Sequence, residues 1–502
     1  MKITIPRWFD WPVLLVFGLV MAVLLRTVVP TVYTLDSGEF VIGAQLLGIV
    51  HSPGYPLYLL VLHLFQQIPL GDIGFRGNLF SAVCLALAAG LTYQLLVIIL
   101  KKRWLAGVTA LIFAWSYYVW VIGLFAEVYA PQLFTIALAG VALVRLGTSA
   151  APGWRSAIMI GVLVGLAISM NPTSIFLIGG VVAVVYRSQF SWLQRITAGL
   201  VSIVLFGAVQ FYFPWRYATG TPYNLAGHYT NQGEFNPVDL STLSGITWMI
   251  SGQQFDSLFF EEGVIPPPAA WIETFLLFIR NFIGIGVVIG LVGLYALYRQ
   301  HRSALVIWSI SFIPYIYFYT SYGAPDKETM FGPALWLWCI PIGLGLRWVA
   351  TRLGSVPWLR WGICALPVLF LLFHFPRLDL SHEWSIRQRA EAALSALPPD
   401  ALLFGRWHDV VPLEYLHLIE KVRPDVKIYN LFLFPPDALE AYIAHLLSRR
   451  RSVLFISSRL SEGDLQIEMG TWLLRGYQVE PQPIRLPADE VPLFLYTLRS
   501  GP

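Results

Sequence analysis

Charged residues and cysteines are scarce in this chain. Only 12% of its 502 residues are charged and only three are cysteine, whereas 57% are hydrophobic. Soluble domains rarely exceed about half apolar residues, so this composition excludes a wholly soluble protein. All three cysteines lie within apolar stretches, which argues against a disulfide framework. The small formal net charge of +4 gives no reason to expect a nucleic-acid partner.

What the chain has instead is a series of long apolar stretches, many of which reach the roughly 20 residues needed to cross a bilayer. They predict a polytopic α-helical membrane protein with about eleven transmembrane helices over residues 1–376. The first stretch resembles a signal sequence, but no small-residue cleavage site follows it, so we expect an uncleaved span. The expected spans are 11–30, 78–100, 105–124, 131–146, 156–170, 173–187, 196–214, 275–298, 303–320, 330–349 and 361–376.

The basic residues predict the orientation of these spans. Placing the N-terminus in the cytoplasm makes five successive inside loops basic, beginning with Lys101-Lys102-Arg103, as the positive-inside rule requires. Counting the short apolar stretch 55–70 as a further span would reverse most of these loops. We therefore expect residues 55–70, which contain Pro56 and Pro69, to form a helix at the membrane interface.

Three segments are expected outside the membrane on the extracytoplasmic side. The first is the external loop 31–77, and the second is the long external loop 215–274, whose length suggests a function such as a lid. The third is a soluble α/β domain over 377–502, which shows neither a glycine-rich phosphate loop nor a fixed repeat. In this domain, strands with a largely parallel arrangement are expected at 401–404, 426–430, 453–457 and 493–498, and helices at 410–420, 437–449 and 465–474.

The first external loop carries two carboxylates, Asp36 and Glu39, three residues apart, a spacing that places both on one helix face. A carboxylate there could deprotonate an attacking hydroxyl or hold a divalent ion beside a phosphate. An Asp followed three residues later by Glu is also a helix-capping pattern. We favour the catalytic interpretation because both lie at a membrane interface.

The turn His51–Pro56 follows these carboxylates and precedes a helix begun by proline. His51 and Tyr55 are candidates for contacting a phosphate or a sugar hydroxyl. A hydrogen-bonded structural histidine is the alternative. The prolines and the glycine are explained by the turn itself.

Four further polar residues lie in outside loops or at the outer ends of spans. Glu127 is either functional, because carboxylates near the apolar slab are costly, or a helix cap. Arg216 could bind a phosphate at two points or anchor to lipid headgroups beside Trp215. Asn171 marks a helix break, and Asp326 lies in a solvated loop that could reach the site. Asn171 and Asp326 are kept as candidate substrate-binding residues.

Several of these motifs resemble those of the protein O-mannosyltransferase-like family, within the GT-C superfamily of membrane glycosyltransferases. The resemblance spans most of residues 30–345 and continues in the tail at 397–400 and 423–426. Its first motif, Asp36–Phe40 with His51–Tyr58, is the most specific. The other matching stretches are Arg76–Ser81, Ala126–Tyr129, Asn171–Thr173, Phe213–Arg216 and Ala324–Asp326.

The resemblance implies a sugar donor attached to a polyprenyl-phosphate carrier and an acceptor that is a protein, a glycan or a lipid. It implies that Asp36 is the catalytic acid/base carboxylate, that Glu39 and Glu127 assist, and that Arg216 holds the carrier phosphate. A divalent metal ion such as Mg²⁺ or Mn²⁺ is a possible cofactor, with Asp36 and Glu39 as its ligands. Ser52 and Asn171 stand where the family commonly has proline or histidine.

These observations predict a mannosyltransferase-like, inverting enzyme of the cell membrane, with its site on the outer face. Two alternatives come from other classes. A lipid or glycan transporter would require ionisable residues in the middle of the spans, which are nearly free of charge. An inactive glycan-binding assembly protein would keep the same motifs.

Overall fold

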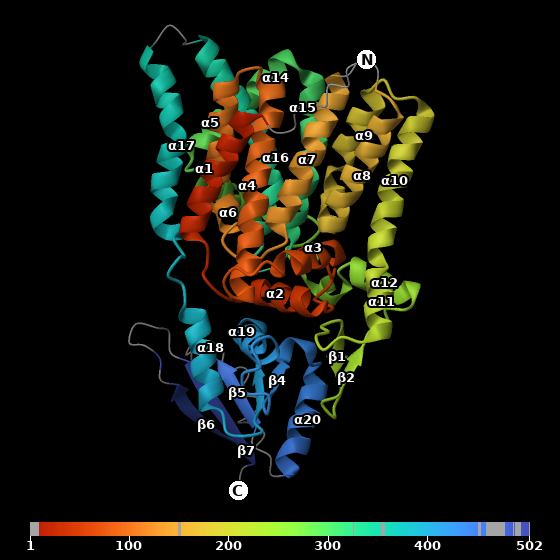
Figure 1. The fold of residues 1–502 in the computed structure, drawn as a ribbon, viewed down its shortest axis with the longest axis vertical. Coiled ribbons are helices and arrows are strands. Elements are labelled where there is room, and N and C mark those ends of the chain that lie inside the picture. The colour runs from red at the N-terminus through yellow and green to blue at the C-terminus, as the bar shows by residue number, and fades with distance from the viewer. Residues whose placement is uncertain are drawn as a thin grey trace.

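A bundle of mostly upright helices forms one part of the molecule, and a small α/β domain lies at one end of it (Figure 1). The computed structural model describes residues 10–148, 152–324, 326–352, 357–449, 453–457, 477–484, 486 and 493–500. Two short helices, α2 (Asp36–Leu46) and α3 (Pro56–Gln66), lie across the end of the bundle that faces the α/β domain. The candidate residues of the first external loop are thus positioned between the two parts.

The remaining elements of residues 10–378 follow in chain order. They are α1 (Trp11–Thr27), α4 (Ile73–Leu100), α5 (Arg103–Ala114), α6 (Tyr117–Val121), α7 (Tyr129–Thr148), α8 (Trp154–Met170), η1 (Pro172–Leu177), α9 (Ile178–Arg187), α10 (Trp192–Gln210), α11 (Tyr212–Thr219), β1 (Gly227–Tyr229), β2 (Phe235–Pro237), α12 (Leu243–Ile250), η2 (Gln253–Leu258), α13 (Pro268–Asn281), α14 (Ile285–Gln300), α15 (Arg302–Ser321), η3 (Thr329–Phe331), α16 (Gly332–Arg352) and α17 (Pro357–Leu378).

The prediction of a polytopic helical membrane protein is confirmed. Within the described residues, six helices are long and apolar enough to cross a membrane, or seven if one bent pair counts as a span, and five shorter helices are apolar. The predicted count of eleven is therefore not confirmed. One expected span, 275–298, is wrong as a single helix, because α13 and α14 meet at 104°. Gly284, at φ +70°, lies in this bend.

Both segments expected to lie outside the membrane, 31–77 and 215–274, contain regular secondary structure. The helix expected within 55–70 forms as α3, which lies across the end of the bundle (Figure 1). The loop 215–274 contains the hairpin β1–β2, helix α12 and the turn η2. Ser52 connects the two loops, since its backbone N–H donates to Gln254 Oε1 at 2.9 Å and its hydroxyl donates to the Met249 carbonyl.

The C-terminal domain is built on a mixed sheet whose described strands lie in the order β4-β3-β5-β7-β6. Three of them, β3 to β5, are parallel, whereas β7 is antiparallel to β5 and β6 is antiparallel to β7. The expectation of a largely parallel sheet is thus wrong for β7 and β6, which pair antiparallel. The strand β6 was not predicted from the sequence. The helix expected at 465–474 lies outside the described residues. The elements are α18 (Ser385–Ala396), β3 (Leu402–Gly405), α19 (Trp407–Leu418), β4 (Lys427–Asn430), η4 (Leu431–Leu433), α20 (Pro436–Ser448), β5 (Val453–Ser457), β6 (Tyr477–Ile484) and β7 (Leu493–Ser500).

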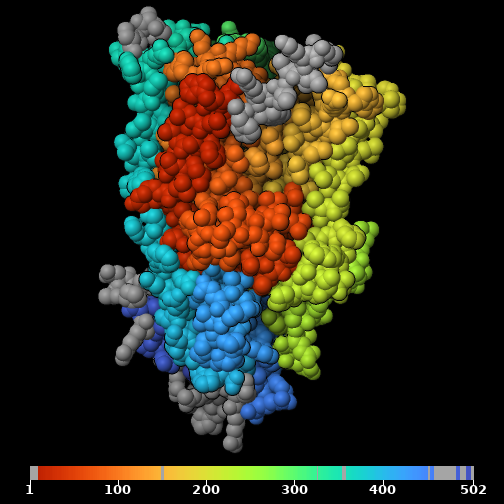
Figure 2. Space-filling model, in the orientation of Figure 1, coloured from red at the N-terminus to blue at the C-terminus, as the bar shows by residue number. Residues whose placement is uncertain are grey.

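The C-terminal domain packs directly on the first external loop, and one hydrophobic core runs through both. Figure 2 shows the two in contact on the face that contains α2 and α3. A Cβ added to Gly38 of α2 would lie 2.5 Å from Val411 Cγ1 of α19, so the two helices approach closely. Arg387 of α18 pairs with Asp72, the N-cap of α4, at 3.3 Å. This packing fixes the position of the domain relative to Asp36 and Glu39.

Candidate active site

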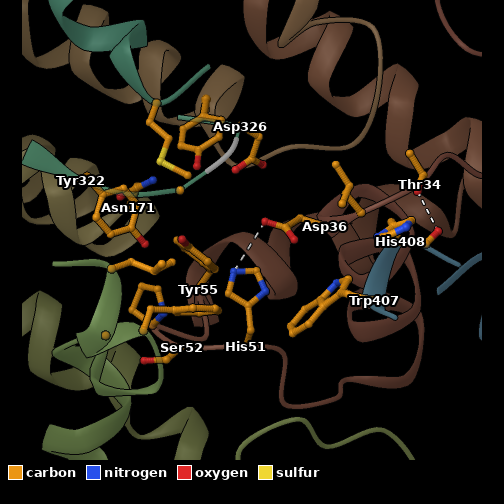
Figure 3. Close-up of a pocket in the computed structure, with 18 of the residues that line it drawn as sticks. Thr34, Asp36, His51, Ser52, Tyr55, Asn171, Tyr322, Asp326, Trp407 and His408 are labelled. Carbon is orange, nitrogen blue, oxygen red and sulfur yellow. Dashed lines mark hydrogen bonds and ion pairs between the residues drawn. The ribbon is translucent and has the colours of Figure 1, made fainter. Parts of the chain in front are cut away.

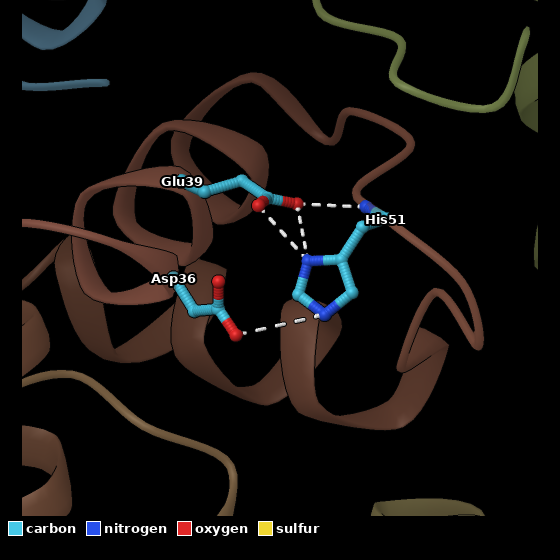
Figure 4. A group of neighbouring side chains, drawn as sticks. All are labelled: Asp36, Glu39 and His51. Atoms are coloured by element: carbon cyan, nitrogen blue, oxygen red, sulfur yellow. Dashed lines mark hydrogen bonds and ion pairs between the residues drawn. The ribbon is translucent and has the colours of Figure 1, made fainter. Parts of the chain in front are cut away.

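Asp36, Glu39 and His51 form a cluster at the start of α2 (Figure 4). The backbone N–H of His51 donates to Glu39 Oε1 at 2.7 Å, and its ring Nδ1 lies 2.9 Å from both Glu39 oxygens. On the other side of the ring, Nε2 lies 3.8 Å from Asp36 Oδ2. The Glu39 side chain is fully buried, whereas that of Asp36 is 26% exposed. Asp36 is therefore the carboxylate of this cluster that a substrate can reach.

The cluster shifts the protonation of its members. Burial raises the pKa of Asp36 to about 6, although the charge of His51 acts to lower it. Burial by itself lowers the pKa of His51. The negative charges of Glu39 and Asp36 outweigh this effect and raise the pKa of His51 to about 9. At neutral pH the ring therefore carries two protons, and Asp36 is a carboxylate of increased basicity.

Local backbone geometry positions these side chains. The N-cap of α2 is Leu35 and makes no side-chain capping bond, so the alternative that Asp36 and Glu39 form a capping box is not supported. Gly54 has φ +80°, and a Cβ there would lie 2.6 Å from the Phe213 ring. This turn therefore requires glycine for both its conformation and its space.

A cavity of about 930 Å³ opens beside Asp36 and His51 (Figure 3). Tyr55, Asn171 and Asp326 also line it, so the structure brings together five of the eight predicted site residues. Burial raises the pKa of Asp326 to about 6, and the negative charge of Asp36 adds to this effect. Asn171 separates α8 from η1, as expected of a helix break, and its Oδ1 accepts from Thr173 N–H at 3.0 Å.

Glu39, Glu127 and Arg216 do not line the cavity. Glu127 is buried between α6 and α7, where its Oε2 accepts from the Val128 N–H at 3.2 Å. Burial and the nearby Asp36 raise the pKa of Glu127 well above its ordinary value. Its backbone N–H donates to Ser81 Oγ, which joins this loop to α4.

Arg216 is engaged in local structure. Its Nε donates to the Leu47 carbonyl at 2.6 Å, and its Nη2 donates to the Gly220 carbonyl at 3.0 Å. Its guanidinium also lies over the Trp215 ring, 5.1 Å from the ring centre. These contacts connect α11 to the end of α2. The geometry therefore does not support the prediction that Arg216 binds a phosphate.

Sequence reasoning missed the contribution of the C-terminal domain. Trp407, His408 and Asp409 line the cavity from the start of α19, and Arg389 lines it from α18. The His408 carbonyl accepts from Thr34 Oγ1 at 2.9 Å, which holds this end of α19 against the first external loop (Figure 3). A signal was present, because residues 406–409 directly follow β3, and ligands commonly bind at the carboxyl ends of parallel strands.

Among the residues that the structure describes, one group of side chains could hold a metal ion. Each of Asp36, Glu39 and His51 offers one ligand atom, and these atoms lie within 4.8 Å of one another. Carboxylate and imidazole ligands suit Mn²⁺ better than Mg²⁺, which prefers oxygen alone. The His51 ring would first have to lose a proton, because a metal binds the neutral imidazole.

Comparisons with known proteins place this geometry in context. Residues 36–194 match the family described as the Protein O-mannosyl-transferase TMEM260 N-terminal domain. The chain is 26% identical to Protein O-mannosyl-transferase TMEM260 of Mus musculus, over 83% of this chain and 62% of the mouse protein. It is 23% identical to Protein O-mannosyl-transferase tmem260 of Dictyostelium discoideum, over 80% of this chain and 55% of that protein. The chain thus spans about three fifths of the length of these relatives.

Solved structures show the same fold. The chain matches ArnT from Cupriavidus metallidurans bound to undecaprenyl phosphate with a TM-score of 0.56 and 13% identity, over 97% of each chain. The match to the apo state of that protein has a TM-score of 0.58 and 12% identity, over 96% of this chain and 97% of ArnT. These comparisons agree with the resemblance seen in the motifs: the chain is similar to proteins named protein O-mannosyl-transferase, and it shares the fold of ArnT.

Proposed function

We propose that this protein transfers a sugar, mannose-like in class, from a polyprenyl-phosphate carrier to an acceptor hydroxyl, with inversion at the sugar. The observation that carries the proposal is the position of Asp36, a desolvated carboxylate that lines a cavity with largely apolar walls. Such a cavity suits a donor that has an apolar chain and a polar head. The names of the relatives support a mannosyl donor, and the ArnT complex supports a polyprenyl phosphate as the carrier.

The proposed chemistry is a single displacement. Asp36 removes the proton from the acceptor hydroxyl, whose oxygen forms a bond to the anomeric carbon of the sugar. The bond from that carbon to the phosphate oxygen breaks, and the polyprenyl phosphate leaves with the electron pair. A base is most effective when its pKa lies near the working pH. Burial raises the pKa of Asp36 toward that pH.

Cations near the leaving phosphate would stabilise the charge that develops there. His51 is held protonated by Glu39 beside Asp36. Arg389 is the only arginine or lysine among the described residues that line the cavity. We therefore place the carrier phosphate against Arg389, in preference to the predicted Arg216, whose side chain is engaged with Leu47 and Gly220.

In the proposed orientation the protein spans the cell membrane, and both the site and the C-terminal domain lie on the extracytoplasmic side. The succession of basic inside loops supports it. The α/β domain lies at the same end of the bundle as α2 and α3, so this orientation applies to the site and the domain together (Figure 1).

The decisive experiment compares purified wild type with Asp36→Asn, using labelled polyprenyl-phosphate mannose and scoring turnover of the donor. Asparagine keeps the shape of the side chain and removes the base, so we expect turnover to fall by about 10² or more. Asp256→Asn, in η2 of the long external loop and outside the cavity lining, is the matched control. Equal turnover by wild type and Asp36→Asn would overturn the role of Asp36. Folded wild type that transports or binds the donor without consuming it would overturn the enzyme proposal.

A further inference from the structure

A second cavity, of about 430 Å³, is lined mainly by α14, α15 and α16. Helix α4 begins beside the C-terminal domain, where its N-cap Asp72 pairs with Arg387, and its opposite end, at Ile99, lines this cavity. The cavity therefore lies toward the end of the bundle away from the α/β domain, near the labels of α14 and α15 in Figure 1. We call it the distal crevice.

The distal crevice runs from the surface into the bundle. Ala304 and Thr351 are exposed at its rim, whereas Leu297 and Leu337 in its interior are buried. An external molecule can therefore enter it from the surface.

The polar side chains in the interior of the crevice are already paired within the protein. Trp308 Nε1 donates to the Leu337 carbonyl at 2.9 Å, and Ser311 Oγ donates to the Ile307 carbonyl at 2.9 Å. Most of the remaining interior walls are aliphatic, as at Leu344. A polar molecule would find few partners there, whereas an alkyl chain requires none.

Arg347 of α16 brings a positive charge to this apolar crevice. It is the only arginine or lysine among the described residues that line the crevice, and it is partly exposed. Its side chain makes no hydrogen bond or ion pair with another residue that the structure describes. By contrast, the guanidinium of Arg352 lies over the Trp348 ring, 4.5 Å from the ring centre. Arg347 is therefore the cation that an external anion can pair with.

The sequence at this end of the bundle supplies positive charge with little negative charge. Five connecting segments contain arginine or lysine but neither aspartate nor glutamate, namely 101–103, 145–155, 187–195, 299–302 and 347–360. Asp10, which precedes α1, does not line the crevice. In the proposed orientation this end meets the cytoplasmic leaflet, whose anionic lipids bind to basic pockets between transmembrane helices.

We propose that the distal crevice binds one anionic phospholipid, with an acyl chain in its apolar interior and the lipid phosphate against Arg347. The acyl chain matches the aliphatic walls, and the phosphate accepts from the guanidinium, which can donate two parallel hydrogen bonds. His301 and Thr351 at the rim can donate to the other headgroup oxygens. The proposal is independent of the proposed reaction, because no described residue lines both the distal crevice and the cavity beside Asp36.

The test is native mass spectrometry of the full-length protein, released from detergent micelles that contain equal amounts of phosphatidylglycerol and phosphatidylcholine with the same acyl chains. Because only phosphatidylglycerol has a net negative charge, the ratio of the two retained lipids measures the contribution of the cation. We expect Arg347→Gln to lower this ratio roughly tenfold. Arg347→Lys keeps the charge and should preserve most of the preference. Arg352→Gln is the matched control, because it removes the same charge from an exposed residue of α16 that does not line the crevice.

A second pair of variants tests the apolar part of the crevice. Ala304→Trp places a large side chain at the exposed rim and should reduce the retention of both lipids. Ser303→Trp, at an exposed residue outside the crevice lining, should leave it unchanged. Thermal unfolding in lipid-free detergent checks that each variant is folded.

Three results would overturn the proposal. Equal losses of phosphatidylglycerol in Arg347→Gln and Arg352→Gln would show a general attraction to the basic end of the bundle. Wild type that retains the two lipids equally would show that the crevice does not select an anion. Replacement of phosphatidylglycerol by an equal amount of added polyprenyl phosphate would assign the crevice to the sugar carrier instead.

Discussion

Glu39 binds His51 through two donors, the backbone N–H at 2.7 Å and the ring Nδ1 at 2.9 Å. This arrangement fixes both the rotamer and the charge of the ring, because a fully buried carboxylate favours a protonated partner. The opposite nitrogen, Nε2, is thereby directed toward Asp36. Glu39 is thus a positioning residue that acts on the substrate only through His51.

Glu39→Gln should lower the pKa of His51, because the amide keeps the shape of the side chain and removes the largest charge that favours the protonated ring. The fall in turnover at high pH should then begin at a lower pH than in wild type. The measurement is the pH profile of donor turnover for the two proteins. Profiles that coincide, in variants of equal stability, would show that Glu39 has no influence on the charge of His51.

Donor turnover should depend on pH in a bell-shaped manner. Asp36 must be deprotonated to act as a base, and burial raises its pKa to about 6, so turnover should rise as the pH increases through about 6. His51 is charged below its pKa of about 9, so turnover should fall above that value. For stability, the raised pKa of His51 means that its favourable contribution is complete below about 6.5 and is lost as the pH rises through about 9. A profile that is flat between pH 5 and 7 would contradict the role of Asp36.

Gly38→Ala should destabilise the contact between α2 and α19. The added Cβ would meet Val411 Cγ1 at 2.5 Å and the Tyr33 carbonyl at 2.9 Å. Overpacking of this kind costs about 1–3 kcal/mol. Thermal unfolding followed in detergent would measure the loss, and turnover should fall with it because residues of both α2 and α19 line the cavity. Gly18→Ala on α1 is the control, since its Cβ would meet nothing within 4 Å.

Arg216 and Arg389 should differ in their effects. Arg216→Gln removes the bond to the Leu47 carbonyl and should cost about 1 kcal/mol of stability while leaving the donor KM unchanged. Arg389→Gln should raise the donor KM, because it removes the cation placed against the phosphate. Steady-state kinetics with polyprenyl-phosphate mannose would separate the two. A raised KM in Arg216→Gln alone would restore the prediction made from the sequence.

Removal of divalent metal should leave turnover unchanged at pH 7. A cation bound among Asp36, Glu39 and His51 would have to displace a proton from His51, whose pKa is about 9. Turnover with and without EDTA, followed by addition of Mg²⁺ or Mn²⁺, tests this expectation. Activity lost to EDTA and regained with either ion would assign the cluster as a metal site.

The sequence by itself determined that the protein is a polytopic membrane protein, and it predicted the centre of the candidate site. A succession of apolar stretches about 20 residues long buries its surface only in a membrane, so these stretches indicated a membrane protein. The spacing of Asp36, Glu39 and His51, with the turn that follows, predicted a shared site. These are local properties, set by composition and by residues less than 20 positions apart. The helix break at Asn171 and the short helix α3 were predictable for the same reason.

The tertiary structure alone decided which polar side chains face the cavity. Glu127 and Arg216 have the residue types of site groups, but packing directs one into the protein and the other onto the Leu47 carbonyl. Trp407 and Arg389 lie more than 350 residues beyond Asp36 in a sequence that reads as a separate domain, yet they line the same cavity. Such contacts depend on how α19 docks on α2, and no periodicity within either helix encodes that docking.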